Sequence, residues 1–302
     1  MSGHHNHGFS VQKNYKKIIL AIFLNCLITA AQLVGGFLTG SLSILSDSLH
    51  NFSDVLALGI CLFAFWLSLK PHSLQKTFGY RRAEILAAFV NILFLLVIGL
   101  FLIKEALFRL YEPKAVDSVW VIYLALFSFV LNLFCCYILR SEKENSLNIG
   151  AAYLHLISDA LTSLAVAFGG VVILYTKAYW VDSLLTLGIS FYLISIALRS
   201  FKKTLSIIMQ FVPSGLDLEK IEEVILKHKM IKNVHHVHLW QLDDKQIHFE
   251  AHLDFSEDLH LSQIQKCFSE IRSELKHKFK INHTVFQPET GQCKDSHLIF
   301  SS

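Results

Sequence analysis

The sequence is short of charged residues. Lys, Arg, Asp and Glu make up only 17% of the 302 residues, the formal net charge is +3, and hydrophobic residues account for 53%. A soluble domain of this length usually carries more charge, and so small a net charge does not indicate binding to nucleic acid. Several apolar runs exceed the length that a helix needs to cross a bilayer. These properties predict a polytopic membrane protein that contacts lipid.

Other features are missing as well. The first ten residues contain no apolar core, so we expect no cleaved signal peptide. The six cysteines form no C-x-x-C pair and no spacing typical of a disulfide framework. The H-E-x-x-H sequence of an intramembrane zinc protease is absent. Only His50 and His155 lie well inside apolar segments, too few for a membrane di-iron oxygenase. We therefore expect that the protein is not an enzyme.

Six apolar segments occupy the first two thirds of the chain, and each is long enough to cross about 30 Å of hydrocarbon as a helix. They are residues 18–38, 41–69, 83–103, 119–139, 151–175 and 181–198. Basic residues gather before the first segment, in the second and fourth connections and after the sixth segment, whereas the odd-numbered connections hold few. Because positive charge favours the cytoplasmic side, we expect both termini in the cytoplasm and the protein in the inner (cytoplasmic) membrane.

After residue 210 the composition becomes that of a soluble domain. The pattern predicts a helix capped near Asp217, a strand at 234–241, a turn at Asp243 and Asp244, a strand at 246–255, a helix at 261–279 and a strand at 283–287. The order α-β-β-α-β is typical of a small two-layer α/β domain. We therefore divide the chain into a cytosolic tail (1–17), a six-helix transmembrane domain (18–210) and a cytosolic α/β domain (211–302).

Two of the apolar segments contain the same polar pattern, His-x-x-Ser-Asp. His50 and Asp54, and likewise His155 and Asp159, are four residues apart and share one face of a helix, and Asp47 shares the face of His50. One Asp at the centre of a bilayer costs roughly 2.5–3.5 kcal/mol on insertion scales. These acids are therefore expected to face the protein interior or a water-filled cavity. Two such helices offer four ligands to one ion, and we count Asp47 among the candidate metal ligands; a structural hydrogen-bond network is the alternative.

The ligand types narrow the choice of ion. Two imidazoles and two carboxylates suit Zn²⁺, and also Co²⁺ or Cd²⁺, better than Ca²⁺ or Mg²⁺, which prefer oxygen ligands. Four protein ligands leave no open position for a catalytic water, which favours transport over hydrolysis. His and Asp release protons when they bind a metal, so a site with alternating exposure would exchange cation for protons. The pattern predicts a secondary transporter that exports Zn²⁺ against H⁺; export of Cd²⁺, Co²⁺, Fe²⁺ or Mn²⁺ and a passive metal channel are the alternatives.

With these motifs the chain resembles the cation diffusion facilitator family, in particular its zinc-exporting bacterial members, over nearly its whole length. The resemblance rests on SDSLHNFSD at 46–54, FGYRRAE at 78–84, HLISD at 155–159 and VHHVHLW at 234–240. It implies a homodimer of six-helix protomers, each with a cytosolic ferredoxin-like domain, that exports Zn²⁺ in exchange for H⁺. It places the transport site on His50, Asp54, His155 and Asp159, and a His at the first position of both pairs is similar to the zinc-preferring type.

The same resemblance implies a second zinc site in the cytosolic domain. The family usually binds zinc there through a His in the first strand, a His in the second strand and an acidic residue near the end. His235, His252 and Glu289 match those places, and His283 lies close by in the sequence. The resemblance therefore makes these four residues candidate metal ligands.

His236 departs from the family pattern, because the residue after the first His is usually acidic. From the alternation of a strand we expect His236 to share a face with His238 and Trp240, while His235 points to the other face. A mixed polar face covered by an interface is the alternative to a metal site.

The roles of six further side chains stay open. The His-rich start is either a disordered tail or a weak metal collector, His72 resembles an accessory site whose partners are missing, and Cys293 with His297 could add ligands to the cytosolic site. We expect His72 to be a solvated loop residue and the segment with Cys293 to be a disordered tail. The residues of the His-rich start are His4, His5 and His7.

Overall fold

The computed structural model describes residues 8–68, 70–71, 73–140, 147–243, 246–291 and 297–299. The expectations for His4, His5, His7, His72 and Cys293 therefore lie outside the described residues. The chain falls into two compact units. One contains Met1–Gly59 and Val90–Ser200, and the other contains Ile60–Phe89 and Phe201–Ser302.

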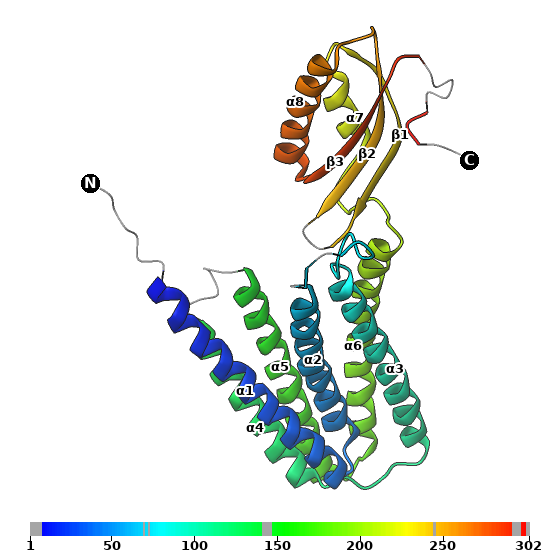
Figure 1. Cartoon of the computed structure of the whole chain (residues 1–302). Helices are drawn as coiled ribbons and strands as arrows, with labels where there is room; N and C mark the ends of the chain where they lie inside the picture. The colour runs from blue at the N-terminus through cyan, green and yellow to red at the C-terminus, as the bar shows by residue number, and fades with distance from the viewer. Residues whose placement is uncertain are drawn as a thin grey trace. The chain divides into compact units, whose positions relative to one another are not determined.

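Six long helices form the first part of the chain (Figure 1): α1 (Gly8–Thr39), α2 (Leu42–Ser68), α3 (Ala83–Tyr111), α4 (Ser118–Leu139), α5 (Leu147–Thr176) and α6 (Trp180–Ile208). Within the described residues, five of them (α1, α3, α4, α5 and α6) contain a segment long and apolar enough to cross a membrane. α2 has 27 residues, which is about 40 Å of helix at 1.5 Å per residue, and it carries the polar stretch. The prediction of a polytopic helical membrane protein is confirmed.

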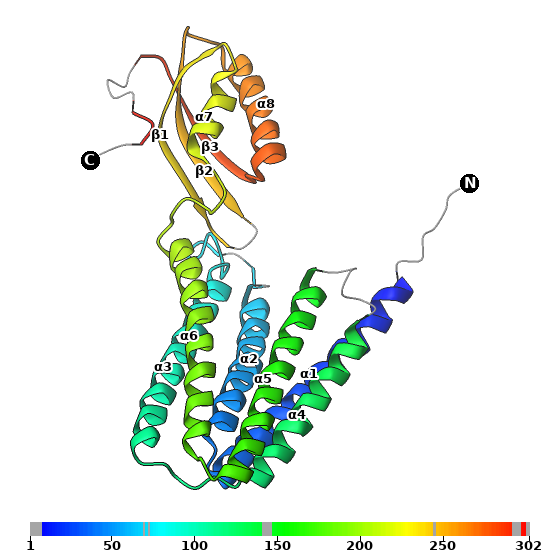
Figure 2. The ribbon, with the colours of Figure 1, turned by 180° about the vertical axis from the view of Figure 1, so that it is seen from behind.

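α4 packs against both α1 and α5 (Figure 2). The approach of α1 to α4 depends on Gly35, because a Cβ atom there would lie 2.2 Å from Cδ1 of Leu124. Small residues allow the backbones of membrane helices to come close together. A side chain at position 35 would therefore displace the side chain of Leu124 in the α1–α4 contact.

Backbone conformation and hydrogen bonds explain where α1 ends and where α4 begins. α1 ends before Gly40, whose φ of +69° lies in the left-handed region that glycine adopts without strain. The carbonyl of Gly40 accepts a hydrogen bond from Nη1 of Arg109 at 2.6 Å, and Thr39 accepts one from the amide of Asp117 at 3.1 Å. Asp117 in turn caps α4, since its side chain accepts from the amide of Trp120 at 3.4 Å.

The beginning of α2 is capped from another helix. Asp182, in the first turn of α6, is only 2% exposed. Its carboxylate accepts hydrogen bonds from the amide of Leu42 at 2.7 Å and from the hydroxyl groups of Ser41 at 2.6 Å and Ser43 at 2.5 Å. The amide of Ser43 donates to it as well, at 3.3 Å. A carboxylate at this position satisfies free amides and is stabilised by the helix dipole, so Asp182 joins α2 to α6.

The C-terminal part is a two-layer α/β domain. Its elements are α7 (Leu218–Leu226), β1 (Ile231–Gln241), β2 (Ile247–Phe255), α8 (Leu261–Phe279) and β3 (His283–Glu289). The sheet has the order β1-β2-β3, with β1 antiparallel to β2 and β2 parallel to β3. α7 and α8 cover one face of it (Figure 1), around a core that includes Phe249 and Ile271. The predicted order α-β-β-α-β is confirmed, and Asp217 caps α7 by accepting from the amide of Glu219 at 3.1 Å.

The alternation of β1 is interrupted at His236. His235 pairs with His252 and His238 pairs with Glu250, so two residues of β1 stand opposite one residue of β2. The φ of His236 is +50°, and together these features define a β-bulge. The expectation that His236 lies with His238 on the face opposite His235 is wrong, because the extra residue turns His236 toward His235 and His252, with ring centroids 5.3 and 4.6 Å away.

We predict that Asp182→Ala lowers the stability of the membrane domain. It leaves the buried amide of Leu42 and one of the hydroxyl groups of Ser41 and Ser43, which lie 3.1 Å apart, without an acceptor, at about 1–3 kcal/mol for each unsatisfied group. The apparent Tm of the full-length protein in detergent should fall by at least about 4 °C. Asp117→Ala is the matched control, since it removes one long hydrogen bond at an exposed cap, and its effect should be smaller. Equal shifts for the two variants would contradict the role of Asp182.

Candidate metal centres

The two His-x-x-Ser-Asp patterns meet between α2 and α5. Nε2 of His155 lies 3.0 Å from Oδ2 of Asp54 and 3.6 Å from Oδ2 of Asp159. Nε2 of His50 lies 3.7 Å from Oδ2 of Asp54 and 4.0 Å from Oδ1 of Asp159. Each imidazole thus contacts a carboxylate of its own helix and one of the other helix. The structure brings together all four residues that the sequence patterns single out.

These separations suit a tetrahedral metal ion. Zinc binds nitrogen and oxygen ligands at about 2.0–2.2 Å, which places tetrahedral ligand atoms about 3.4 Å apart. The ligand atoms of His50, His155 and Asp159 all lie within 4.8 Å of one another. Asp159 is 3% exposed, and its Oδ2 accepts no hydrogen bond from the described part of the chain. A buried carboxylate oxygen without a donor is well placed to bind a cation.

The structure does not bring Asp47 into this group. Its Oδ2 accepts hydrogen bonds from Nε2 of Gln32 at 2.5 Å and from the hydroxyl of Ser163 at 3.3 Å. Oε1 of Gln32 in turn accepts from Nδ2 of Asn51 at 3.1 Å. Asp47 and Gln32 are 2% and 1% exposed. Asp47 therefore lies in a separate buried network that links α1, α2 and α5, about one helical turn from His50.

Four members of this network were not predicted from the sequence: Gln32 of α1, Ser163 of α5, and Ser128 and Asn132 of α4. Ser128 and Asn132 continue the chain of hydrogen bonds from Ser163. The two hydroxyl groups lie 2.9 Å apart, and Nδ2 of Asn132 donates to Ser128 at 3.4 Å. The amide side chains of Gln32 and Asn132 within apolar segments could have indicated a buried polar network, since such groups rarely face lipid.

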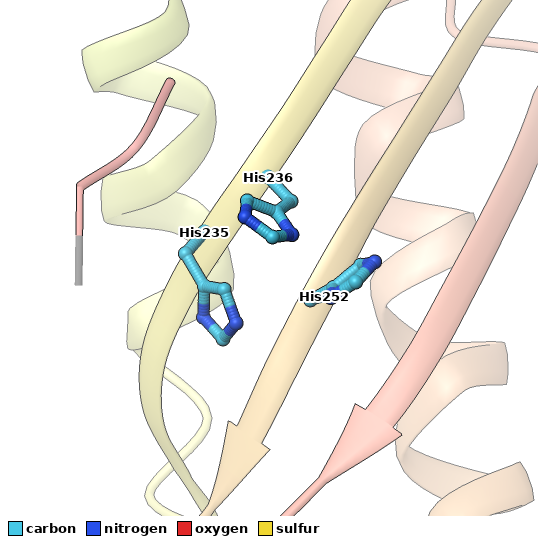
Figure 3. A group of neighbouring side chains, drawn as sticks. All are labelled: His235, His236 and His252. Atoms are coloured by element: carbon cyan, nitrogen blue, oxygen red, sulfur yellow. The ribbon is translucent and has the colours of Figure 1, made fainter. Parts of the chain in front are cut away.

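A second cluster lies in the cytosolic domain. Figure 3 shows the imidazole rings of His235 and His236, from β1, gathered beside that of His252, from β2. One ring nitrogen of each lies within 4.8 Å of the others. The carboxylate of Glu289, at the end of β3, joins them: Oε2 lies 3.1 Å from Nε2 of His235, and Oε1 lies 2.8 Å from Nδ1 of His252. The cluster contains three of the predicted residues and one, His236, that was expected elsewhere.

The structure does not bring His283 to this cluster. It begins β3, six residues before Glu289, which is about 20 Å along a strand. Its ring lies 4.5 Å from that of His248, its neighbour on β2, and the ring of Trp240 stacks on the other side of His248 at 5.3 Å. Burial, together with the nearby His283, lowers the pKa of His248. These aromatic contacts place His283 in a separate, packed pair.

Two protein-family models match the chain. Residues 18–209 match the cation efflux transmembrane domain, and residues 213–290 match the cytoplasmic domain of cation efflux proteins. A zinc transporter ZitB of Pectobacterium atrosepticum is 32% identical, over 98% of this chain and 92% of its own. The metal cation efflux system protein CzcD of Cupriavidus metallidurans is 31% identical over 94% and 89%. A cadmium, cobalt and zinc/H(+)-K(+) antiporter of Bacillus subtilis is 33% identical over 96% and 92%.

We predict that Asp54→Ala and Asp47→Asn differ in their effect on metal binding. Asp54→Ala removes a ligand and a negative charge from the cluster, so Zn²⁺ affinity should fall by at least about tenfold. Asp47→Asn leaves the four ligand side chains in place and should keep most of the affinity. Equilibrium Zn²⁺ binding would be measured on full-length protein in which His235 and His252 are also replaced by Ala, so that only the membrane site contributes. Equal losses of Zn²⁺ affinity in the two variants would contradict the separation of Asp47 from the metal-binding cluster.

Proposed function

Because the chain belongs to the cation efflux family, with both of that family's domains present, we propose that it exports Zn²⁺ from the cytoplasm in exchange for protons. The observation that carries the proposal is the cluster of two His and two Asp between α2 and α5. Similarity to proteins named as zinc transporters and as a cadmium, cobalt and zinc antiporter supports divalent metal efflux as the activity. The protein is a multi-pass membrane protein.

The ligand types explain both the choice of ion and the exchange. Two imidazole nitrogens and two carboxylates form a tetrahedral set that favours Zn²⁺ over Ca²⁺ or Mg²⁺. The same groups take up protons when the metal leaves. In this scheme a site open to the cytoplasm binds Zn²⁺ and releases protons, and a site open to the outside does the reverse. Zn²⁺ and H⁺ thus compete for His50, Asp54, His155 and Asp159, which couples their movements.

The four ligands come from two helices, which suggests how the ion is released. α2 supplies one His/Asp pair and α5 supplies the other. Two contacts join the pairs across the helices, His50 with Asp159 and His155 with Asp54. A small displacement of α5 along α2 would change both of these cross contacts and leave each i, i+4 pair intact. Such a shift divides a four-ligand site into two two-ligand halves. This favours transport by alternating access over a continuously open channel.

We further propose that both termini are cytoplasmic and that the membrane is the bacterial inner membrane. The first, third and fifth connections lie together at one end of the helices, through the contacts of Gly40 with Arg109 and of Ser41 with Asp182. These connections are poor in Lys and Arg compared with those at the other end. Positive charge favours the cytoplasmic side, which supports an outer location for the Gly40 end.

In the cytosolic domain we propose a Zn²⁺ site built on His235, His252 and Glu289, and assembly of the protein as a homodimer. Two imidazoles within 3.1 Å of one buried carboxylate are suitable ligands for zinc. The second matched family model is named for a zinc-transporter dimer domain, which supports a role of this part of the chain in dimerisation.

We predict that purified protein in liposomes accumulates Zn²⁺ only when the vesicle interior is more acidic than the medium. Protons leaving the vesicle drive Zn²⁺ inward, so a protonophore should abolish accumulation. Asp159→Ala, at equal protein, should reduce the initial rate to that of empty vesicles, since it removes a ligand of the site. Zn²⁺ entry that continues unchanged with the protonophore would favour a passive channel, and a wild-type rate in Asp159→Ala would disprove the assignment of the site.

We also predict that His50→Asp relaxes selectivity while transport continues. The substitution keeps four ligands but replaces a neutral nitrogen with a charged oxygen, which suits harder ions such as Mn²⁺. A carboxylate can also bind through both oxygens, as larger ions such as Cd²⁺ tolerate. The ratio of Mn²⁺ or Cd²⁺ to Zn²⁺ transport rates within each variant should rise, and using a ratio removes differences in expression. An unchanged ratio would show that His50 does not contact the ion.

A further inference from the structure

The β-bulge in β1 places a strained residue beside the cytosolic cluster. His236 has a φ of +50°, a region that residues with a Cβ atom enter at a cost and glycine enters freely. The bulge position that needs such a φ is usually occupied by glycine. A histidine at this position therefore raises the conformational energy of the backbone. Residues strained in this way persist only where the surrounding structure holds them in place, and they are found most often at functional sites.

The bulge is held from outside the sheet as well. The second bulge residue, Val237, donates its amide hydrogen to the carbonyl of Leu298 at 3.0 Å, and Leu298 packs against the core of the domain. Regular pairing resumes at His238, which faces Glu250. The surrounding contacts therefore keep His236 in its left-handed conformation and its ring 4.6 Å from that of His252.

The result is a set of four metal-binding side chains. Ring nitrogens of His235, His236 and His252 lie within 4.8 Å of one another, and Glu289 contacts two of the imidazoles. His235 is 1% exposed and Glu289 is 8% exposed. Nδ1 of His235 is buried and makes no hydrogen bond with the described residues. A regular strand would have presented only three of these side chains on this face.

We propose that His236 is the fourth ligand of the cytosolic metal site, which makes it a three-His, one-Glu site for Zn²⁺ or a similar divalent cation, complete within one protomer. The proposal rests on the proposed zinc binding by His235, His252 and Glu289 and adds a ligand to it. A complete tetrahedral set holds the ion without a ligand from a partner subunit and leaves no position for a catalytic water. The backbone strain at His236 is compensated when the metal binds.

The decisive variant is His236→Gly, because a ligand role and a structural role predict different results. Glycine relieves the strain, so the metal-free protein should have a higher Tm than the wild type. Loss of the fourth ligand should at the same time lower Zn²⁺ affinity by at least about tenfold and reduce the rise in Tm that Zn²⁺ produces. The matched control is His238→Gln, which removes an exposed imidazole two residues away and outside the cluster; its Zn²⁺ affinity should equal that of the wild type.

The measurements use full-length protein in detergent with Asp54→Ala and Asp159→Ala, so that metal bound at the membrane site does not contribute. Zn²⁺ affinity and Tm are measured with and without His236→Gly, and Co²⁺ absorption spectra report the coordination of the bound ion. An unchanged affinity and an unchanged Co²⁺ spectrum in His236→Gly would overturn the proposal and make the bulge purely structural. Failure of this background to bind Zn²⁺ at all would overturn the cytosolic site and leave the transport proposal, which is tested in liposomes, intact.

The variant His236→Asn checks that altered backbone geometry is not the cause of the lower Zn²⁺ affinity expected for His236→Gly. Asn tolerates the left-handed region better than most residues and therefore keeps the bulge, but its amide is a poor zinc ligand. It should lose affinity to a similar degree as His236→Gly. Wild-type affinity in His236→Asn, with loss only in His236→Gly, would show that the backbone and not the imidazole matters, and would also overturn the proposal.

Discussion

A carboxylate or imidazole in the membrane needs a partner, and the helical domain is arranged around this requirement. Hydrocarbon offers neither water nor hydrogen-bond donors, so an isolated charge there is costly. The acids of this domain have different partners. Asp182 accepts hydrogen bonds at the beginning of α2, Asp47 accepts them from Gln32 and Ser163, and Asp54 lies against His155. Asp182 and Asp47 thus each accept hydrogen bonds from two or more donors, whereas Oδ2 of Asp159 has no donor among the described residues.

This difference separates supporting groups from candidate ligands. The acids that accept two or more hydrogen bonds link helices: Asp182 joins α2 to α6, and Asp47 joins α2 to α1 and α5. The acids at the cluster contact imidazoles, whose protonation and metal binding exclude each other. A group that must bind and release an ion cannot also be permanently saturated with hydrogen bonds. These supporting networks, at the beginning of α2 and one turn before His50, therefore orient α2 while leaving the ligand atoms available.

The cytosolic domain uses backbone geometry for a similar purpose. A strand alternates its side chains, so two successive histidines would normally point to opposite faces. The bulge at His236 places both on one face next to His252, at the cost of a positive φ in a residue with a bulky side chain. At the opposite end of the sheet His248 and His283 keep regular positions and pack as a pair with Trp240. Histidines in one small sheet thus have different environments, which the number of histidines alone does not reveal.

Local sequence patterns determined the elements of this protein, because helix and strand periodicity and capping residues act over a few neighbouring residues. Apolar length predicted the membrane helices, Asp217 predicted the start of α7, and the i, i+4 spacing placed His50 with Asp54 and His155 with Asp159. Only the tertiary structure decided that α2 and α5 present these pairs to each other. It also decided that Asp47 bonds to Gln32 instead of joining the cluster, because Gln32 comes from another helix. The position of His236 could not be predicted either, since a bulge depends on how β1 pairs with β2, and this pairing is set by packing across the whole domain.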